Sequence, residues 1–225
     1  MKGISAYLLV GLTIGITALT ASSLKATGSS SSTNIIQPSN ALSFFRIVGK
    51  LKSLKRTGWI NHSVSLPESV ADHMYRMTMM SMMIKDNEID RDRLMKICLV
   101  HDLAESIIGD ITPHDKRFTK EQKREAEENA LRSIAMNVND KMIEEELIDL
   151  WLDYENCNSK EAKIAKNLDK FEMILQADEY EQSQSMTLDD FFESTKNSFD
   201  HPEVQGWNEL LRSERYQRQL QQDMK

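Results

Sequence analysis

From residue 39 onward, apolar residues recur at the three- and four-residue spacing of amphipathic helices. The pattern predicts helices over residues 39–58, 67–86, 90–108, 119–137, 140–153, 159–184 and 187–198. Pro67 suits the first turn of the second helix, and Gly109 suits the end of the third. We find no run that alternates apolar and polar residues as a half-buried strand does. We therefore expect an all-α fold, a single bundle of about six to eight helices with a site between them.

Residues 1–38 do not continue this helical pattern. An apolar stretch over residues 4–20 follows Lys2, and a Ser- and Thr-rich spacer leads from it to the first helix. A signal peptide, a membrane anchor or an organelle transit segment would have this composition, and an inert extension is the alternative. Because the stretch is shorter than the roughly 20 apolar residues of a membrane span, the location of the protein stays open between cytoplasm, organelle and membrane.

We accordingly divide the chain into a leader (1–38), a folded domain (39–215) and a polar, frayed tail (216–225). The formal net charge of −7 provides no basic surface for a nucleic acid polymer, so a small-molecule substrate fits better. Cys98 and Cys157 lack the spacing of a metal site, and we expect both to be reduced. Six methionines between Met74 and Met83 are interpreted as filler of the core.

The candidate chemistry is concentrated in the segment HDLAESIIGD, residues 101–110. On one continuous helix, His101 and Glu105 are four positions apart and Asp102 lies three before Glu105, so these side chains would face one groove. Gly109 would end the helix in the left-handed conformation and turn Asp110 back toward that groove.

A solvated charged face is the alternative interpretation of this segment. It is disfavoured because the apolar neighbours leave little of the helix to face water, and buried carboxylates are costly unless they are paired or bind a metal. These neighbours are Leu99, Val100, Leu103, Ala104, Ile107 and Ile108.

Two further residues are candidates to complete a ligand set. His73 lies on the apolar stripe of the second predicted helix, where a histidine is often simply part of the core. Asp169 lies at the border of the core stripe in IAKNLDKFEMILQA, and by itself it could be merely half exposed. With His101 and Asp102 they make a set of two histidines and two carboxylates drawn from three helices. Mixed sites of this kind suit Mn, Co, Fe, Ni or Zn better than Mg alone.

The order of these residues resembles the HD-domain metal-dependent phosphohydrolases. The segments PESVADHMYR, HDLAESIIGDITP and LDKFEMILQA are similar to their 5'-deoxynucleotidase branch, and the resemblance extends over most of residues 40–200. It implies that His73, His101, Asp102 and Asp169 bind one divalent ion, with Mn, Co or Mg as the expected metals.

The resemblance implies roles for further residues. Glu105 and Asp110, with the carbonyl of Ile111, would serve a second ion or the attacking water. In nucleotidases of this branch, an Arg and a Trp just before the second helix contact the phosphate and the deoxyribose.

Trp59 stands at the matching distance from His73 for this substrate contact. Arg56 is three residues before Trp59 instead of adjacent to it, which leaves open its role and the strictness of selectivity for 2'-deoxy sugars. Trp59 could equally be a hydrophobic plug that packs the loop onto the helices.

We expect the chain to remove the 5'-phosphate of deoxynucleoside monophosphates with a metal-activated water, as a homodimer if the resemblance holds. Hydrolysis of another phosphate ester, such as a cyclic nucleotide or a guanosine polyphosphate, is the alternative within the same chemistry. A metal-containing scaffold without turnover is the alternative from a different class. The presence of Glu105 and Asp110 argues against the scaffold, because a purely structural site does not need them.

Overall fold

The computed structural model describes residues 35–113 and 115–224, so nearly all of the predicted leader lies outside the described residues. Within this part the chain forms helices and no strand, apart from one isolated bridge between Lys55 and Ser69. The helices are α1 (Pro38–Gly49), α2 (Thr57–Asn61), α3 (Val70–Ser81), α4 (Arg91–Val100), α5 (Glu105–Ile108), α6 (Lys120–Val138), α7 (Lys141–Asn156), α8 (Lys160–Gln184), α9 (Asp189–Ser194) and α10 (Pro202–Asp223), with a short 3-10 turn η1 (Lys50–Lys52). The expected all-α fold is confirmed.

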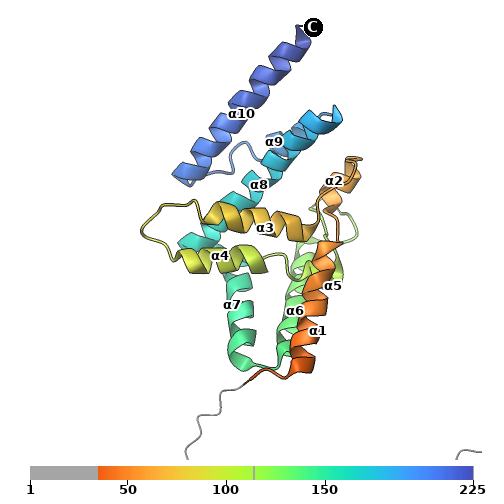
Figure 1. Ribbon diagram of the computed structural model, residues 1–225, viewed down its shortest axis with the longest axis vertical. Coiled ribbons are helices and arrows are strands. Elements are labelled where there is room, and N and C mark those ends of the chain that lie inside the picture. Colours follow the sequence, from red (N-terminus) through yellow and green to blue (C-terminus); the bar gives the residue numbers. More distant parts are fainter. Residues whose placement is uncertain (1–34, 114, 225) are drawn as a thin grey trace, which may run out of the picture. The chain divides into compact units, whose positions relative to one another are not determined.

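The helices that carry the candidate ligands form the centre of the core. α3 and α4 lie side by side, and both pack against α8 (Figure 1). Their buried faces meet through Val70 and Met77 of α3, Leu94 and Ile97 of α4, and Leu168 of α8. Among the described residues, no helix is both long and apolar enough to cross a membrane.

The first predicted helix, 39–58, is divided in the structure. The chain leaves the helical path before α2 because the segment 54–56 pairs with 68–70: Val70 N donates to Leu54 O over 2.9 Å, and Arg56 N donates to Glu68 O over 3.2 Å. α3 begins three residues after Pro67. A reciprocal pair of hydrogen bonds between Ser69 and Asp72 caps its first turn.

Two other expectations about the helices are corrected. The helix predicted over 90–108 ends at Val100, and residues 101–104 form turns before α5 begins. The pattern missed α10, which continues through most of the predicted frayed tail to Asp223. α10 is held by packing against α8, with Val204 and Leu211 buried, and by an ion pair from Arg215 to Glu181 of α8. Such long-range contacts leave no periodic signal in a polar sequence.

The methionines of α3 and of the residues directly after it are only partly core residues. Met74 and Met77 are buried, whereas Met79, Met82 and Met83 are about half exposed. Within the described residues α3 packs against α4, α8 and η1, and these contacts leave Met79 about half uncovered.

Candidate metal centre and substrate cavity

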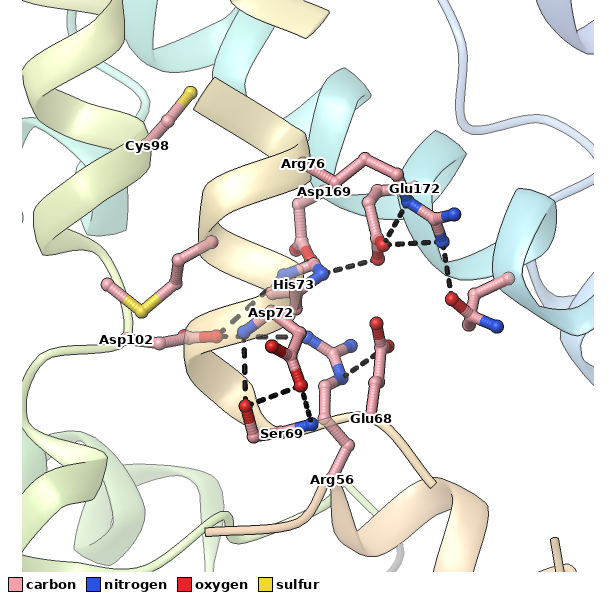
Figure 2. Close-up of polar contacts among 12 residues, drawn as sticks. Arg56, Glu68, Ser69, Asp72, His73, Arg76, Cys98, Asp102, Asp169 and Glu172 are labelled. Carbon is pink, nitrogen blue, oxygen red and sulfur yellow. Dashed lines mark hydrogen bonds and ion pairs between the residues drawn. The ribbon is translucent and has the colours of Figure 1, made fainter. Parts of the chain in front are cut away.

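His73 is completely buried at the meeting point of α3 and α8, and its two ring nitrogens have different surroundings. Nδ1 donates a hydrogen bond to Glu172 Oε2 on α8. Nε2 faces the other way, 3.2 Å from Asp169 Oδ1 and 3.9 Å from Asp102 Oδ2 (Figure 2). The neutral ring therefore carries its proton on Nδ1 and points the Nε2 lone pair at two carboxylates.

His101 and Asp102 follow directly after the last residue of α4. His101 Nδ1 donates to the carbonyl of Cys98 over 3.0 Å, and its Nε2 lies 3.1 Å from Asp102 Oδ2. The His101 ring packs on Tyr154 with centroids 4.8 Å apart, and the Tyr154 hydroxyl donates to Asp169 Oδ2 over 2.9 Å. Both histidines are thus anchored through Nδ1, while Nε2 faces the carboxylates.

These atoms fit a divalent ion. One atom each from His73, His101 and Asp102 lie within 4.8 Å of one another, and Asp169 lies beside His73. The two Nε2 atoms are buried and have no hydrogen-bond partner among the residues that the structure describes. A buried nitrogen acceptor without a donor is costly, and a metal ion would satisfy both nitrogens and neutralise the carboxylates.

The charges of the candidate ligands compensate one another. Burial and the Arg56 charge oppose protonation of His73, but Glu172 and Asp169 outweigh them and raise the pKa of His73 to about 9. Burial alone would raise the pKa of Asp169, whereas the neighbouring His73, with Nε2 3.2 Å from Asp169 Oδ1, brings it well below the usual value. A proton on His73 thus supplies part of the positive charge that a metal ion would supply. Metal binding must displace that proton.

Glu105 and Asp110 lie next to this set on a separate short segment. Glu105 is buried, and its Oε2 has no hydrogen-bond partner within the described part of the chain. Burial, and then the charges of Asp102 and Asp110, raise the pKa of Glu105 well above its usual value. Asp110 Oδ2 accepts from Thr57 N over 2.6 Å, and Asp110 O accepts from the Thr57 hydroxyl over 2.8 Å.

The grouping of Glu105 with Asp102 has a different origin from the predicted one. It arises from the turns between α4 and α5 and not from the predicted three-residue spacing on a continuous helix. Gly109 has the expected positive φ of 80°, but with ψ at 168° it is extended instead of left-handed helical. The break also exposes Leu99 and Ile107, each by about half, so the apolar enclosure inferred from the segment is incomplete.

A cavity of about 560 Å³ opens over the ligand set. Its lining combines charged groups with an apolar wall, and it includes Arg56, Trp59, Asp102, Glu105, Asp110, Ile111, Lys123, Asp169, Met173 and Phe191. A second cavity of about 510 Å³ shares Asp102, Ile111, Lys123 and Asp169 with the first and adds the basic side chains of Lys120, Arg124 and Lys166. The two cavities meet at the candidate ligands.

Arg56 and Trp59 lie one helical turn apart at the start of α2, so the three-residue spacing puts them on the same side. Arg56 Nη1 lies 3.9 Å from Asp102 Oδ2. Trp59 is almost completely buried, and its Nε1 donates to Glu68 Oε1 over 2.9 Å. Its ring packs on Phe191 with centroids 4.5 Å apart. Trp59 thus fills the space beneath α2 and also lines the cavity.

Three residues near the site were missed by the sequence reasoning. Glu172, Glu68 and Tyr154 each contact a predicted site residue through a side-chain hydrogen bond. For Glu172 a signal existed, since it lies one turn after Asp169 on the same helix face. Nothing in the sequence pointed to Glu68 or Tyr154, because tertiary packing decides which side chains they contact.

This chain is similar to known proteins in both sequence and fold. A family model described as HD domain matches residues 48–206. The 5'-deoxynucleotidase HDDC2 of Dictyostelium discoideum is 50% identical over 177 residues, covering 73% of this chain and 92% of that protein. The protein of the same name from Homo sapiens is 48% identical over 165 residues, covering 72% of this chain and 80% of that protein.

A solved structure agrees with these relatives. A conserved hypothetical protein from Pyrococcus furiosus superposes with a TM-score of 0.65 at 30% identity, over 78% of this chain and 99% of that one. The matched residues 48–206 include both histidines and both carboxylates of the candidate ligand set. The chain therefore belongs to the HD-domain family.

Proposed function

We propose that the chain is a metal-dependent phosphomonoesterase that converts deoxynucleoside 5'-monophosphates to deoxynucleosides and phosphate. The observation that carries the proposal is the pair of buried Nε2 atoms, on His73 and His101, that face Asp102 and Asp169 at the base of an open cavity. The 5'-deoxynucleotidase names of relatives that are about half identical to the chain support it.

His73, His101, Asp102 and Asp169 would hold one divalent ion, for which this donor set favours Mn or Co, with Mg as a further candidate. Bound there, the ion would polarise a phosphoryl oxygen and lower the pKa of a coordinated water. Glu105 and Asp110, with the Ile111 carbonyl, are the groups that could bind a second ion.

Glu105 is the residue best placed to move a proton. Glu105 lines the cavity, its buried Oε2 has no hydrogen-bond partner among the described residues, and burial with the charges of Asp102 and Asp110 raises its pKa, which favours uptake of a proton. We assign it the proton of the attacking water. Asp110 is held by Thr57 at the start of α2, which links the catalytic segment to the helix that carries Trp59.

The wall of the larger cavity supplies recognition of the substrate. The Arg56 guanidinium, directed at Asp102, can bind the phosphate oxygens, since arginine pairs with phosphate through two parallel hydrogen bonds. The apolar surface of Met173 and of Phe191, which packs on the buried Trp59, suits the sugar and base of a nucleoside.

Another phosphate ester remains the second candidate substrate, and one observation favours it. The adjoining cavity carries Lys120, Lys123, Arg124 and Lys166, which could accommodate phosphates beyond the one that is cleaved. A guanosine polyphosphate would use both cavities, whereas a deoxynucleoside monophosphate needs only the one beside Trp59.

A substrate panel separates these two candidates. With Mn or Co present, we expect deoxynucleoside 5'-monophosphates to release inorganic phosphate faster than ribonucleotides, di- and triphosphates, cyclic nucleotides or guanosine polyphosphates. Phosphate release from each compound is the measurement. Intact deoxynucleoside monophosphates beside a cleaved polyphosphate or cyclic ester would overturn the proposed substrate.

Removal of a ligand tests the metal mechanism. Asp102→Ala should lose both bound metal and nearly all activity, because Asp102 is the carboxylate shared between the two histidines. Metal content by elemental analysis and phosphate release are the readouts. Asp149→Ala is the control, since Asp149 is an exposed carboxylate that pairs with Arg93 away from the cavity. Full activity in Asp102→Ala would contradict the mechanism.

Arg56 tests the phosphate contact. Arg56→Ala should lower kcat/KM about 10- to 100-fold, the loss expected for hydrogen bonds to a charged group worth roughly 1.5–3 kcal/mol. Metal content should be retained. Lys170→Ala, which removes another cation that lines the same cavity, should change kcat/KM little. An Arg56→Ala enzyme as efficient as the unsubstituted one would exclude Arg56 from substrate binding.

We also propose that the chain forms a homodimer and that residues 1–38 are a targeting or anchoring segment. An exposed apolar stripe supports the dimer: Tyr75, Met79 and Met82 recur at helical spacing along α3 and just beyond its end.

The proposal about the leader, residues 1–38, concerns residues outside the described part, apart from 35–38. Fusion of residues 1–38 to a fluorescent protein would test it, and an unchanged distribution of that protein would contradict it.

The stripe on α3 predicts the effect of a charge on assembly. Met79→Lys should shift the protein from dimer to monomer, because a lysine in an apolar interface must be desolvated without a partner. Light scattering of the purified chain gives the mass. Glu145→Lys, a charge change at an exposed carboxylate of α7, is the control. A dimer that persists in Met79→Lys would place the interface elsewhere.

A further inference from the structure

Beneath the candidate metal centre lies a carboxylate that is not in the ligand set. Glu172 on α8 is completely buried, and its two oxygens have separate partners. Oε2 accepts from His73 Nδ1, and Oε1 accepts from Arg76 Nε over 2.9 Å and lies 2.8 Å from Arg76 Nη2 (Figure 2). A carboxylate in this position is costly unless both oxygens are paired, and here they are.

Arg76 is itself held in place by α8. Its Nη1 donates to both oxygens of Glu179, over 3.0 and 2.8 Å, and its Nη2 donates to Gln176 Oε1 over 2.7 Å. Asp169, Glu172, Gln176 and Glu179 follow one another at helical spacing along α8. One face of α8 therefore supplies both a candidate metal ligand and the support of the histidine beside it.

The position of Glu172 determines which nitrogen of His73 is available. A carboxylate oxygen only accepts hydrogen bonds, so the proton of the neutral ring must be on Nδ1. Nε2 is then left with its lone pair directed at Asp102 and Asp169. An acceptor behind the ring also increases the basicity of the ligating nitrogen.

A cation among Glu68, His73 and Glu172 is the competing interpretation, because these three offer ligand atoms within 4.8 Å of one another. Two guanidinium groups argue against it. Arg76 already pairs with Glu172, and Arg56 Nε lies 3.9 Å from Glu68 Oε1. The positive charge on the Nδ1 side of His73 is thus supplied by the protein itself.

We propose that Glu172, clamped by Arg76, is a positioning residue that fixes the tautomer and orientation of His73 for metal binding. The inference rests on the proposed function only in that the Nε2 side of His73 holds a divalent ion. It assigns Glu172 no contact with the metal or the substrate.

Glu172→Gln is the sharpest test because it changes the shape little. Arg76 requires an acceptor, so the amide oxygen should face Arg76 and the amide NH₂ should face His73 Nδ1. The ring would then carry its proton on Nε2, where the metal binds. We expect the affinity for Mn²⁺, titrated directly on the purified chain without substrate, to fall roughly 10- to 100-fold. At saturating Mn²⁺, kcat should fall less, relative to the unsubstituted chain, than the Mn²⁺ affinity does.

Glu179→Gln is the matched control. It makes the same chemical change on the same helix and at the same arginine, but Glu179 has no contact with His73 in the described structure. Its Mn²⁺ affinity should equal that of the unsubstituted chain. Equal affinity in Glu172→Gln would overturn the inference, and so would an equal loss in both variants, which would indicate a general loosening of α8.

The same titration separates a failure of the proposed function from a failure of this inference. An unsubstituted chain that binds no divalent ion would overturn the proposed function and this inference together, whereas the outcomes above overturn the inference alone.

Should circular dichroism show that Glu172→Gln is unfolded, Arg76→Lys replaces it. That variant weakens the clamp and should lower Mn²⁺ affinity in the same direction, and an unchanged affinity would again contradict the inference.

Discussion

The buried imidazole of His73 is the group on which the rest of the site depends. It has no exposed surface, and it lies between carboxylates on both sides, with Glu172 at Nδ1 and Asp169 and Asp102 at Nε2. Three buried or half-buried negative charges around one ring are stable only with positive charge between them. Arg76 provides it beside Glu172, whereas on the other side Arg56 lies 3.9 Å from Asp102 and a proton or a divalent ion must add to its charge. The need for a cation is thus a property of the packing of α3 against α8.

Hydrogen bonds that involve the backbone connect the substrate side of the cavity to the same helices. The strand-like pairing of residues 54–56 with 68–70 connects the approach to α2 with the first turn of α3, which carries His73. Thr57 joins α2 to Asp110 by two hydrogen bonds. Because α2 is held from both directions, Arg56 is presented to the ligand set by rigid elements and not by a free loop, which suits a residue that must meet a phosphate.

The two cavities give one site two kinds of surroundings. Beside Trp59 the wall is aromatic and apolar, whereas beside α6 it is basic, and the candidate ligands lie where the two meet. A group bound at the candidate ligands would therefore meet an apolar wall on one side and a basic wall on the other.

The sequence by itself determined the helical fold and pointed to His73, His101, Asp102 and Asp169 as candidate ligands, because amphipathic spacing and the order of these residues can be read along the chain. Only the tertiary structure decided how these groups meet. The turns at 101–104, the burial of Trp59, the docking of α10 and the contact between His73 and Glu172, 99 residues apart, all arise from packing between distant segments. Such contacts depend on which faces of the helices meet in three dimensions, and a periodic pattern along one chain does not encode that choice.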